Sequence, residues 1–266
     1  MYRIIICVKA VPDPKRADHI RIDPVSKTLN RSEAPLVLNP LDKHAVEAAL
    51  QIKETTAGAF LTVISMGPPE AGNIVRECLA LGADEGILLS DRAFAGADTY
   101  ATAFTLARGI EKIGRFDLIF CGMASSDGGT EWIGPQIATF LGVPVVTMVS
   151  ELTETEQETW KVKACIENGY RLMQVKLPAL FTVTRKLNSP RSLSFSGIVR
   201  ARKKQIICWS AEDLGVAENM LGLSGSPTGV SAMTTRSSRR QVEIINGTGE
   251  EKAEKLVQKL ADAGLV

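Results

Sequence analysis

Short apolar runs that alternate with segments of helical periodicity dominate the first 150 residues, and this alternation constrains the fold more than any other feature. Each run has the length of a buried strand, and the segments between runs place apolar residues three and four positions apart, as helices do. Strands and helices in this alternation predict an α/β protein with a doubly wound, mostly parallel sheet. The predicted strands are residues 3–9, 60–66, 86–90, 116–120 and 143–149.

The segment between the first two predicted strands has two local signals. Asn39 followed by Pro40 predicts a helix start, with Asn39 as the N-cap and proline at its favoured first position. Residues 10–14 contain two prolines and are predicted to form a loop at the end of the first strand. Residues 15–38 are polar and irregular, and we expect at most a small hairpin there.

The pattern changes after residue 150. Residues 160–166 and 170–176 alternate with a period of two on either side of a Glu-Asn-Gly turn, which predicts an antiparallel hairpin at one edge of the sheet. Residues 180–183 form a further apolar strand.

Beyond residue 205 no regular alternation is expected until an amphipathic helix at 250–262. A tail of about 60 residues with little core of its own usually lies on another surface. We therefore expect an α/β domain over 1–204 and an arm over 205–266 that lies on a partner subunit. The alternative is a tail that folds on its own domain. The apolar face of the predicted helix carries Ala253, Leu256, Val257 and Leu260.

A glycine-rich polar loop follows the apolar strand 116–120 and precedes a helix that ends near Leu141. In a parallel sheet this is the carboxyl end of a strand, where ligands usually bind, and the first N–H groups of the helix would face an anion there. Gly128 and Gly129 would let the backbone approach a phosphate, and Asp127 or Thr130 is expected to cap the helix. The loop therefore favours a cradle for a nucleotide phosphate; an ordinary turn between strand and helix is the alternative.

Several function classes are disfavoured by what the chain lacks. A net charge of +1 gives no electrostatic reason to bind nucleic acid or a membrane surface, and no apolar run approaches the ~20 residues of a membrane span. The apolar amino terminus lacks a cleavage site and is predicted to be a strand. Five widely spaced cysteines suggest neither disulfides nor a zinc site, and we expect a cytoplasmic protein with buried thiols.

Motifs for phosphate binding and for acid–base catalysis are missing as well. No Gly-x-Gly-x-x-Gly follows a strand, and no Gly-Lys-Ser/Thr P-loop occurs. The only histidines are His19 and His44, so a hydrolytic triad or a histidine metal site is not expected. A nucleotide loop without acid–base residues is typical of a binder or carrier in which a cofactor supplies the chemistry.

Several motifs in order along the chain resemble the beta subunit of electron-transfer flavoproteins, nearly from end to end. They include the first strand and loop, the start of the first helix, the hairpin with the strand that follows it, and a partner-recognition segment. Their residues are Cys7-Val8-Lys9-x-Val11-Pro12-Asp13, Asn39-Pro40-x-Asp42-Lys43-x-Ala45-x-Glu47-Ala48-Ala49, Glu167-Asn168-Gly169, Pro178-Ala179-Leu180-Phe181-Thr182-Val183, and Leu187-Asn188-Ser189-Pro190-Arg191 through Ile198, Ala201 and Lys203-Lys204.

The resemblance implies a Rossmann-like α/β subunit that binds an adenine nucleotide and pairs with an alpha subunit that holds an electron-transferring FAD. In the simple carriers of this family the beta subunit binds AMP. In the electron-bifurcating branch it binds a second FAD that takes hydride from NADH. Asp127-Gly128-x-Thr130 with Gly134-Pro135 resembles the bifurcating branch, although Trp132 stands where Gln is usual, Gly129 where Asp is common and Ala124 where Gln is usual.

The resemblance also implies the site residues and the partners. Electrons would pass to the alpha-subunit FAD and a flavin dehydrogenase, and in bifurcation also to ferredoxin or flavodoxin. The alternatives are a simple carrier with structural AMP and, in another class, a free-standing nucleotide-binding regulator. The expected partner-binding residues are Phe195, Ile198 and Arg191; the expected cofactor-binding residues are Ala10, Asn39, Leu41, Asp42, Met66, Gly67, Gly122, Met123, Ala124, Asp127, Gly128, Gly129, Thr130, Trp132, Ile133, Gly134 and Pro135.

Overall fold

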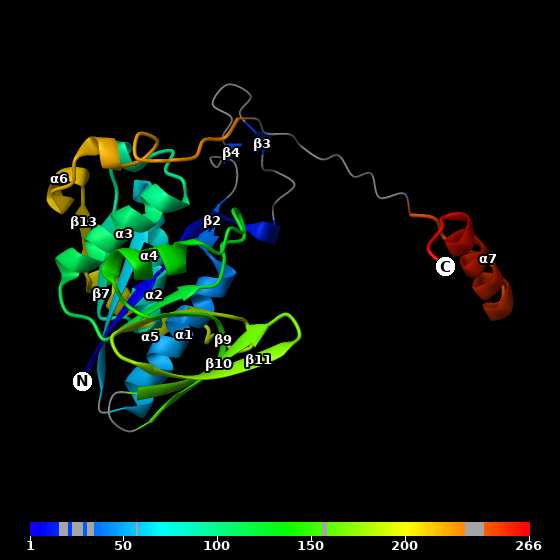
Figure 1. Cartoon of the computed structure of the whole chain (residues 1–266), viewed down its shortest axis with the longest axis horizontal. Coiled ribbons are helices and arrows are strands. Elements are labelled where there is room, and N and C mark those ends of the chain that lie inside the picture. Colours follow the sequence, from blue (N-terminus) through cyan, green and yellow to red (C-terminus); the bar gives the residue numbers. More distant parts are fainter. Residues whose placement is uncertain (16–20, 23–28, 31–34, 57, 156–158, 232–241) are drawn as a thin grey trace. The chain divides into compact units, whose positions relative to one another are not determined.

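The computed structural model describes residues 1–15, 21–22, 29–30, 35–56, 58–155, 159–231 and 242–266. The chain divides into two compact units, Met1–Ser231 and Ala232–Val266. The first unit is built on a nine-stranded sheet with helices on both faces (Figure 1). The α/β fold with a mostly parallel, doubly wound sheet, predicted from the sequence, is confirmed.

The strands of the sheet lie in the order β11-β10-β9-β12-β8-β1-β6-β7-β13. All neighbours from β9 to β13 pair in parallel, and the hairpin of β10 and β11 is antiparallel at one edge, as predicted. The bounds are β1 Tyr2–Cys7, β6 Ala59–Met66, β7 Glu85–Leu89, β8 Leu118–Gly122, β9 Val145–Glu154, β10 Thr159–Ile166, β11 Gly169–Lys176, β12 Ala179–Val183 and β13 Ile206–Trp209.

The helices of the first unit form two layers. Helices α1, α2 and α5 share one hydrophobic core with the sheet, and α3, α4 and α6 share the other. Alternate residues of the central strand β1 divide between these cores, because successive strand side chains point to opposite faces. The helix bounds are α1 Pro40–Thr55, α2 Gly72–Leu81, α3 Thr99–Ile113, α4 Ile133–Leu141, α5 Phe195–Lys203 and α6 Ala211–Leu214.

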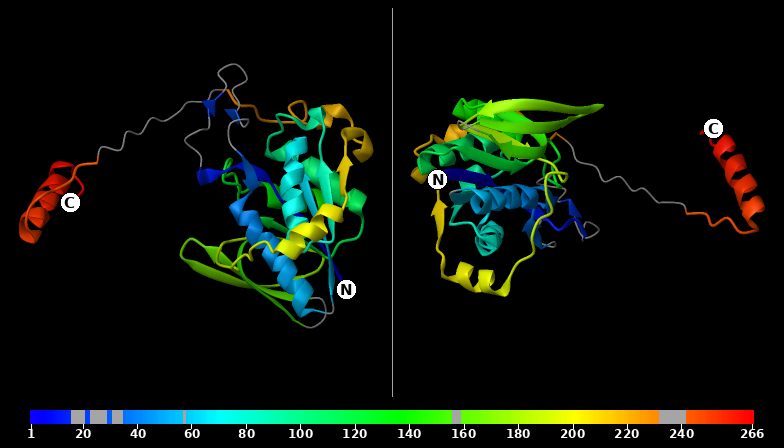
Figure 2. Two further views of the ribbon diagram at one scale, coloured as in Figure 1. Left: turned by 180° about the vertical axis from the view of Figure 1, so that it is seen from behind. Right: turned by 90° about the horizontal axis from the view of Figure 1, so that it is seen from below.

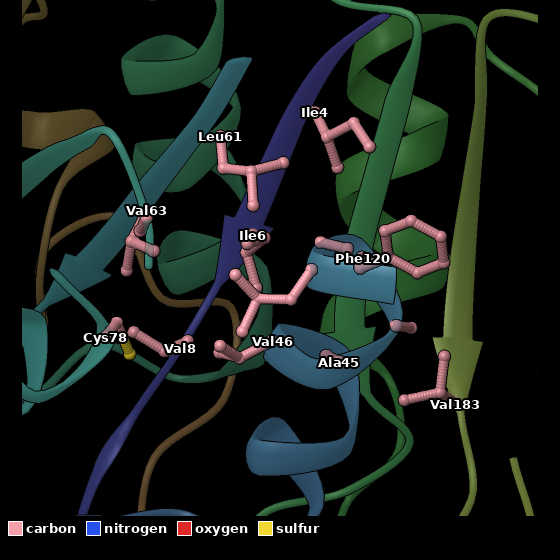
Figure 3. Close-up of a cluster of buried hydrophobic side chains, with 14 of the residues drawn as sticks. Ile4, Ile6, Val8, Ala45, Val46, Leu61, Val63, Cys78, Phe120 and Val183 are labelled. Atoms are coloured by element: carbon pink, nitrogen blue, oxygen red, sulfur yellow. The ribbon is translucent and has the colours of Figure 1, made fainter. Parts of the chain in front are cut away.

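Figure 3 shows the core beneath α1 and α2. Ile4 and Ile6 of β1, Val46 of α1 and Phe120 of the neighbouring β8 belong to this one cluster of side chains. All four side chains are essentially inaccessible to solvent. The core therefore fixes the carboxyl ends of β1 and β8 side by side.

The strand order reverses at β1. From β1 the chain continues to β6 on one side, and it later returns to β8 on the other. The connections after β1 and β8 lead to α1 and α4, which lie on opposite faces of the sheet. In open α/β sheets, the crevice at such a reversal is the usual ligand site.

Several short elements were not expected. Residues 10–12, predicted as loop, form strand β2 (Ala10–Pro12), which pairs antiparallel with β5 (Leu36–Leu38) outside the main sheet. No regular alternation was expected beyond 205, but the first unit contains two further elements there, β13, which pairs with β7, and α6. The small hairpin expected within 15–38 is present as β3 (Arg21–Ile22) and β4 (Leu29–Asn30).

The second unit contains the predicted amphipathic helix, α7 (Gly249–Asp262). A capping box begins it: the Thr248 hydroxyl accepts from the N–H of Glu251, whose carboxylate accepts from the N–H of Thr248. In the described part of the chain, no helix combines the length and the apolar character needed to cross a bilayer.

Candidate functional site

The carboxyl ends of β1 and β8 are joined by one buried carboxylate, that of Asp42 in the first turn of α1. Its Oδ2 accepts from the backbone N–H of Lys9 (2.8 Å) and its Oδ1 from that of Gly122 (3.0 Å). A Cβ at residue 122 would lie 2.5 Å from Oδ1 of Asp42, so only glycine fits there. Burial, partly offset by hydrogen bonds, raises the pKa of Asp42 to about 7.

Asn39 is the N-cap residue of α1 by position, but its side chain does not cap the helix. Its Nδ2 donates to the carbonyl of Ala124 (2.9 Å), and its Oδ1 accepts from the N–H of Ser126 (3.2 Å). Because the side chain is buried, both amide atoms need partners, and the loop backbone supplies them. Asn39 therefore shapes the loop after β8, which we call the nucleotide loop (residues 122–135).

A cation lies beside this loop. The Lys9 Nζ donates to Asp127 Oδ1 at 2.7 Å and lies 3.4 Å from the Ser125 hydroxyl. The Asp127 carboxylate is nearly buried, whereas Lys9 keeps 42% of its side chain exposed. The prediction that Asp127 or Thr130 caps α4 was wrong: the N-cap position belongs to Trp132, with no side-chain cap, and Asp127 pairs with Lys9 instead.

The nucleotide loop ends in the first turn of α4. The N–H groups of Ile133 and Gly134 have no acceptor within the helix, as at any helix start. A Cβ at Gly134 would lie 2.5 Å from the Thr182 side chain of β12, so glycine lets the helix end approach the sheet closely. Just before the helix, Glu131 has a positive φ of 63° and Trp132 is 63% exposed. A left-handed conformation at a residue with a Cβ costs about 1 kcal/mol or more and is typical of functional loops.

Five other predicted cofactor residues lie in three places. Leu41 lies against the start of the loop, since a Cβ built on Gly122 would come within 2.8 Å of it. Met123 is part of the loop, and its N–H donates to the carbonyl of Val183 in β12. Met66 ends β6, which neighbours β1, and the N–H of Gly67 donates to the carbonyl of Leu89 in β7; among the described residues no backbone hydrogen bond joins either of them to the loop. Ala10 is buried in β2.

Sequence reasoning missed Lys9, Ser125 and Ser126 as site residues. Lys9 belongs to the first strand motif, but its approach to a loop more than 110 residues away depends on the pairing of β1 with β8. The signal available in the sequence was a lysine at the end of the first predicted strand, 3–9. The predicted loop likewise begins at the end of a predicted strand, 116–120.

The predicted partner residues lie far along the chain, in residues 187–204, which we call the docking segment. Phe195 opens α5 and is 83% exposed, so it is not a core residue. Ile198 is exposed one turn later. Arg191, in contrast, forms ion pairs within the chain, with Glu47 and Glu54 of α1.

Comparison with known proteins gives one consistent family. The model of the electron transfer flavoprotein domain matches residues 26–214. The chain is 45% identical over 259 residues to the electron transfer flavoprotein subunit beta of Clostridium acetobutylicum, with 97% of this chain and 98% of that protein covered. It is 47% identical over 258 residues to the subunit of the same name from Thermoanaerobacterium thermosaccharolyticum, with 97% of each covered. It is 43% identical over 265 residues to subunit CarD of the caffeyl-CoA reductase-Etf complex of Acetobacterium woodii, with 99% of this chain and 100% of that protein covered.

Proposed function

The chain belongs to the beta-subunit family of electron transfer flavoproteins, as its motifs predicted, and from this premise we propose that it binds FAD on the nucleotide loop and passes electrons from NADH toward an alpha subunit and a dehydrogenase. A bound flavin supplies the redox chemistry, since it accepts a hydride and releases single electrons. The chain itself binds and orients that group.

The donor set at the nucleotide loop carries the proposal. Backbone N–H groups at the start of α4, the ammonium group of Lys9 and the hydroxyls of Ser125 and Thr130 are groups that bind phosphate oxygens. Lys9 also neutralises the neighbouring Asp127 carboxylate, which would otherwise repel a phosphate. The residues present therefore fit the pyrophosphate of FAD.

AMP is the second candidate ligand, because one phosphate would use the same donors. The FAD proposal rests on the resemblance of the loop to the FAD-binding branch, through Asp127, Gly128, Thr130, Gly134 and Pro135. The exposed Trp132 offers an aromatic surface at the rim of this loop, which suits a second ring system better than a compact mononucleotide.

The docking segment supports the second half of the proposal. Phe195, Ile198 and Val199 expose apolar surface on one short helix, and Arg200, Arg202 and Lys203 are exposed beside them. An exposed aromatic residue with flanking cations suits a partner that has an apolar pocket and an acidic rim. The caffeyl-CoA reductase named for the Acetobacterium woodii complex makes an acyl-CoA reductase the class of partner to test.

A nucleotide count tests the proposed cofactor. The chain is purified together with its alpha subunit and denatured, and the released FAD and AMP are quantified per heterodimer. Two FAD and no AMP are expected, one FAD being held by each subunit; one FAD and one AMP would leave a simple carrier.

A matched pair of variants assigns the beta site. Asn39→Ala removes both side-chain hydrogen bonds to the nucleotide loop and should lose the beta-site nucleotide while one FAD remains. Asn168→Ala, at the exposed tip of the β10–β11 hairpin, should keep both. Equal nucleotide content in the two variants would place the second nucleotide elsewhere.

A further inference from the structure

The docking segment is fixed to α1 by side chains that lie along one face of that helix. The Asn188 Nδ2 donates to the carbonyl of His44 (3.0 Å), and the His44 Nδ1 lies 3.0 Å from the carbonyl oxygen of Asn188. Three and ten positions beyond His44, the carboxylates of Glu47 and Glu54 both bind Arg191. The chain between β12 and α5 is therefore held at two points before it reaches Phe195.

The guanidinium group of Arg191 is almost fully used by these contacts. Its Nε and Nη2 donate to Glu47 at 2.8 and 3.0 Å, and its Nη1 and Nη2 donate to Glu54 at 2.6 and 3.0 Å. The backbone N–H of Arg191 adds a bond of 3.1 Å to Glu47. Four of the five guanidinium N–H groups thus have partners in the chain, and little capacity is left for another protein.

Glu47 is the buried member of this cluster. Only 6% of its side chain is exposed, against 57% for Glu54. A buried carboxylate is stable only when its oxygens are paired, and those of Glu47 receive three bonds from Arg191. Because the guanidinium group and the carboxylate are planar and meet at two points, the pair fixes the orientation of the Arg191 side chain as well as its distance from Glu47.

The other end of α5 is held independently. Arg76 of α2 donates to the carbonyls of Ala201 (2.7 Å) and Lys204 (3.1 Å), and the ammonium group of Lys204 donates to that of Ala83 (2.6 Å). Figure 2 shows α5, in yellow, beside α2, with which it packs. The first turn of α5 also touches α2, where buried Gly197 lies against the Ala80 carbonyl, and the path of the chain into that turn is set by the contacts that precede it.

We infer that Glu47 is a positioning residue for partner docking: it holds Arg191, and Arg191 sets the path of the chain into α5 and so the direction in which Phe195 faces. The inference rests on the proposed docking function of residues 187–204. Glu47 cannot reach a partner itself, because its carboxylate lies beneath Arg191. The competing role for Arg191 is a direct ion pair with the partner.

Two substitutions separate these roles. Glu47→Gln keeps the size of the side chain and removes its charge, and Arg191→Met removes the guanidinium group. Lys43→Met is the matched control, since it also removes an ion pair of α1, the partly exposed pair with Glu77 of α2, but leaves the contacts of Glu47 and Arg191 in place. Each variant, and the double variant, is prepared as the complex with the alpha subunit.

The first measurement is the electron-transfer assay with caffeyl-CoA reductase as the probe. We expect Glu47→Gln and Arg191→Met to raise the KM for the flavoprotein by about tenfold each with little change in kcat, as loss of a charge-assisted contact suggests. The double variant should match either single variant, because both act through one contact. If Arg191 instead bound the partner directly, Glu47→Gln would leave the KM for the flavoprotein unchanged or lower it. That result would overturn the inference.

The second measurement needs no partner. Hydrogen exchange of the amides in residues 195–201 should be about tenfold faster in Glu47→Gln than in Lys43→Met. Unchanged exchange would overturn the inference whatever the assay shows. If the unmodified complex failed to use the reductase, the proposed partner class would fail, and hydrogen exchange would still decide the role of Glu47.

Discussion

Among single residues, Asp42 links the stability of the fold around the candidate site to pH. Its carboxyl group has a pKa of about 7 in the folded chain, because burial disfavours the charged form, against about 3.9 in an unfolded chain. The folded chain therefore holds a proton that the unfolded chain releases between these values. The stability that this proton contributes is fully present below pH ~4 and is lost as pH rises to about 7.

We predict that the free energy of unfolding falls between pH 5 and pH 8 by a few kcal/mol from Asp42 alone. Asp42→Asn should remove this component, although it lowers stability at both pH values by about 1–3 kcal/mol, because one of the two backbone N–H donors would then face the amide NH2 group, which is itself a donor. Urea unfolding of both proteins at the two pH values measures the difference. Parallel pH dependence in the two proteins would contradict the prediction.

Gly122 gives a steric prediction at the same place. Its missing Cβ leaves room for the Asp42 carboxylate and for the backbone of Leu41, which a methyl group would approach to 2.5 and 2.8 Å. Gly122→Ala should therefore cost about 1–3 kcal/mol of stability and reduce bound nucleotide. Gly72→Ala is the control, since a Cβ there would meet only ordinary contacts at 3.8 Å or more. Thermal unfolding and nucleotide content are measured for both; equal loss in the two variants would refute the steric argument.

Among the elements, those set by local periodicity could be predicted from the sequence, and those set by distant pairing could not. The strands of the parallel core and the β10–β11 hairpin follow from apolar runs and alternation. Strand β2 was missed because its three residues include a proline and pair with β5 across 24 or more positions. Strand β13 was missed because four residues at the sheet edge are too few to show a period.

The same distinction applies to the candidate site. The nucleotide loop was found from its glycines and polar residues between a strand and a helix. The roles of Asn39 and Asp127 as caps were mistaken, because their side chains bind groups 85 and 118 positions away. Local sequence favours capping by such residues, and only the folded sheet brings the competing partners near.

Helix α5 carries a prediction about docking. Phe195 is 83% exposed, so Phe195→Ala should leave the fold unchanged and raise the KM for the caffeyl-CoA reductase probe by about tenfold or more, as loss of an aromatic anchor does. Tyr170→Ala on β11, another exposed aromatic residue, is the control and should have no effect. An equal effect of both changes, or none at Phe195, would argue against α5 as the docking element.

At the scale of the whole molecule, the part of the second unit that the structure describes, residues 242–266, has no core of its own. Of the described residues from 242 to 266, only Ile245 and Leu260 are half-buried; all others are exposed, and α7 has no buried residue. An isolated helix of 14 residues is marginal in water, so its apolar face needs a surface to cover it. We proposed from the sequence that this surface belongs to the alpha subunit.

The apolar face of α7 permits a test of that proposal. Leu256→Lys and Val257→Lys place a charge on the face that carries Ala253 and Leu260, and they should weaken association with the alpha subunit by about tenfold or more, because a buried lysine without a partner is costly. Gln258→Lys adds the same charge on the opposite face, next to Asp262, and should leave association unchanged. Analytical ultracentrifugation of each complex over a dilution series measures the dissociation constants. Equal constants for all three variants would show that the tail does not use this face to hold the alpha subunit.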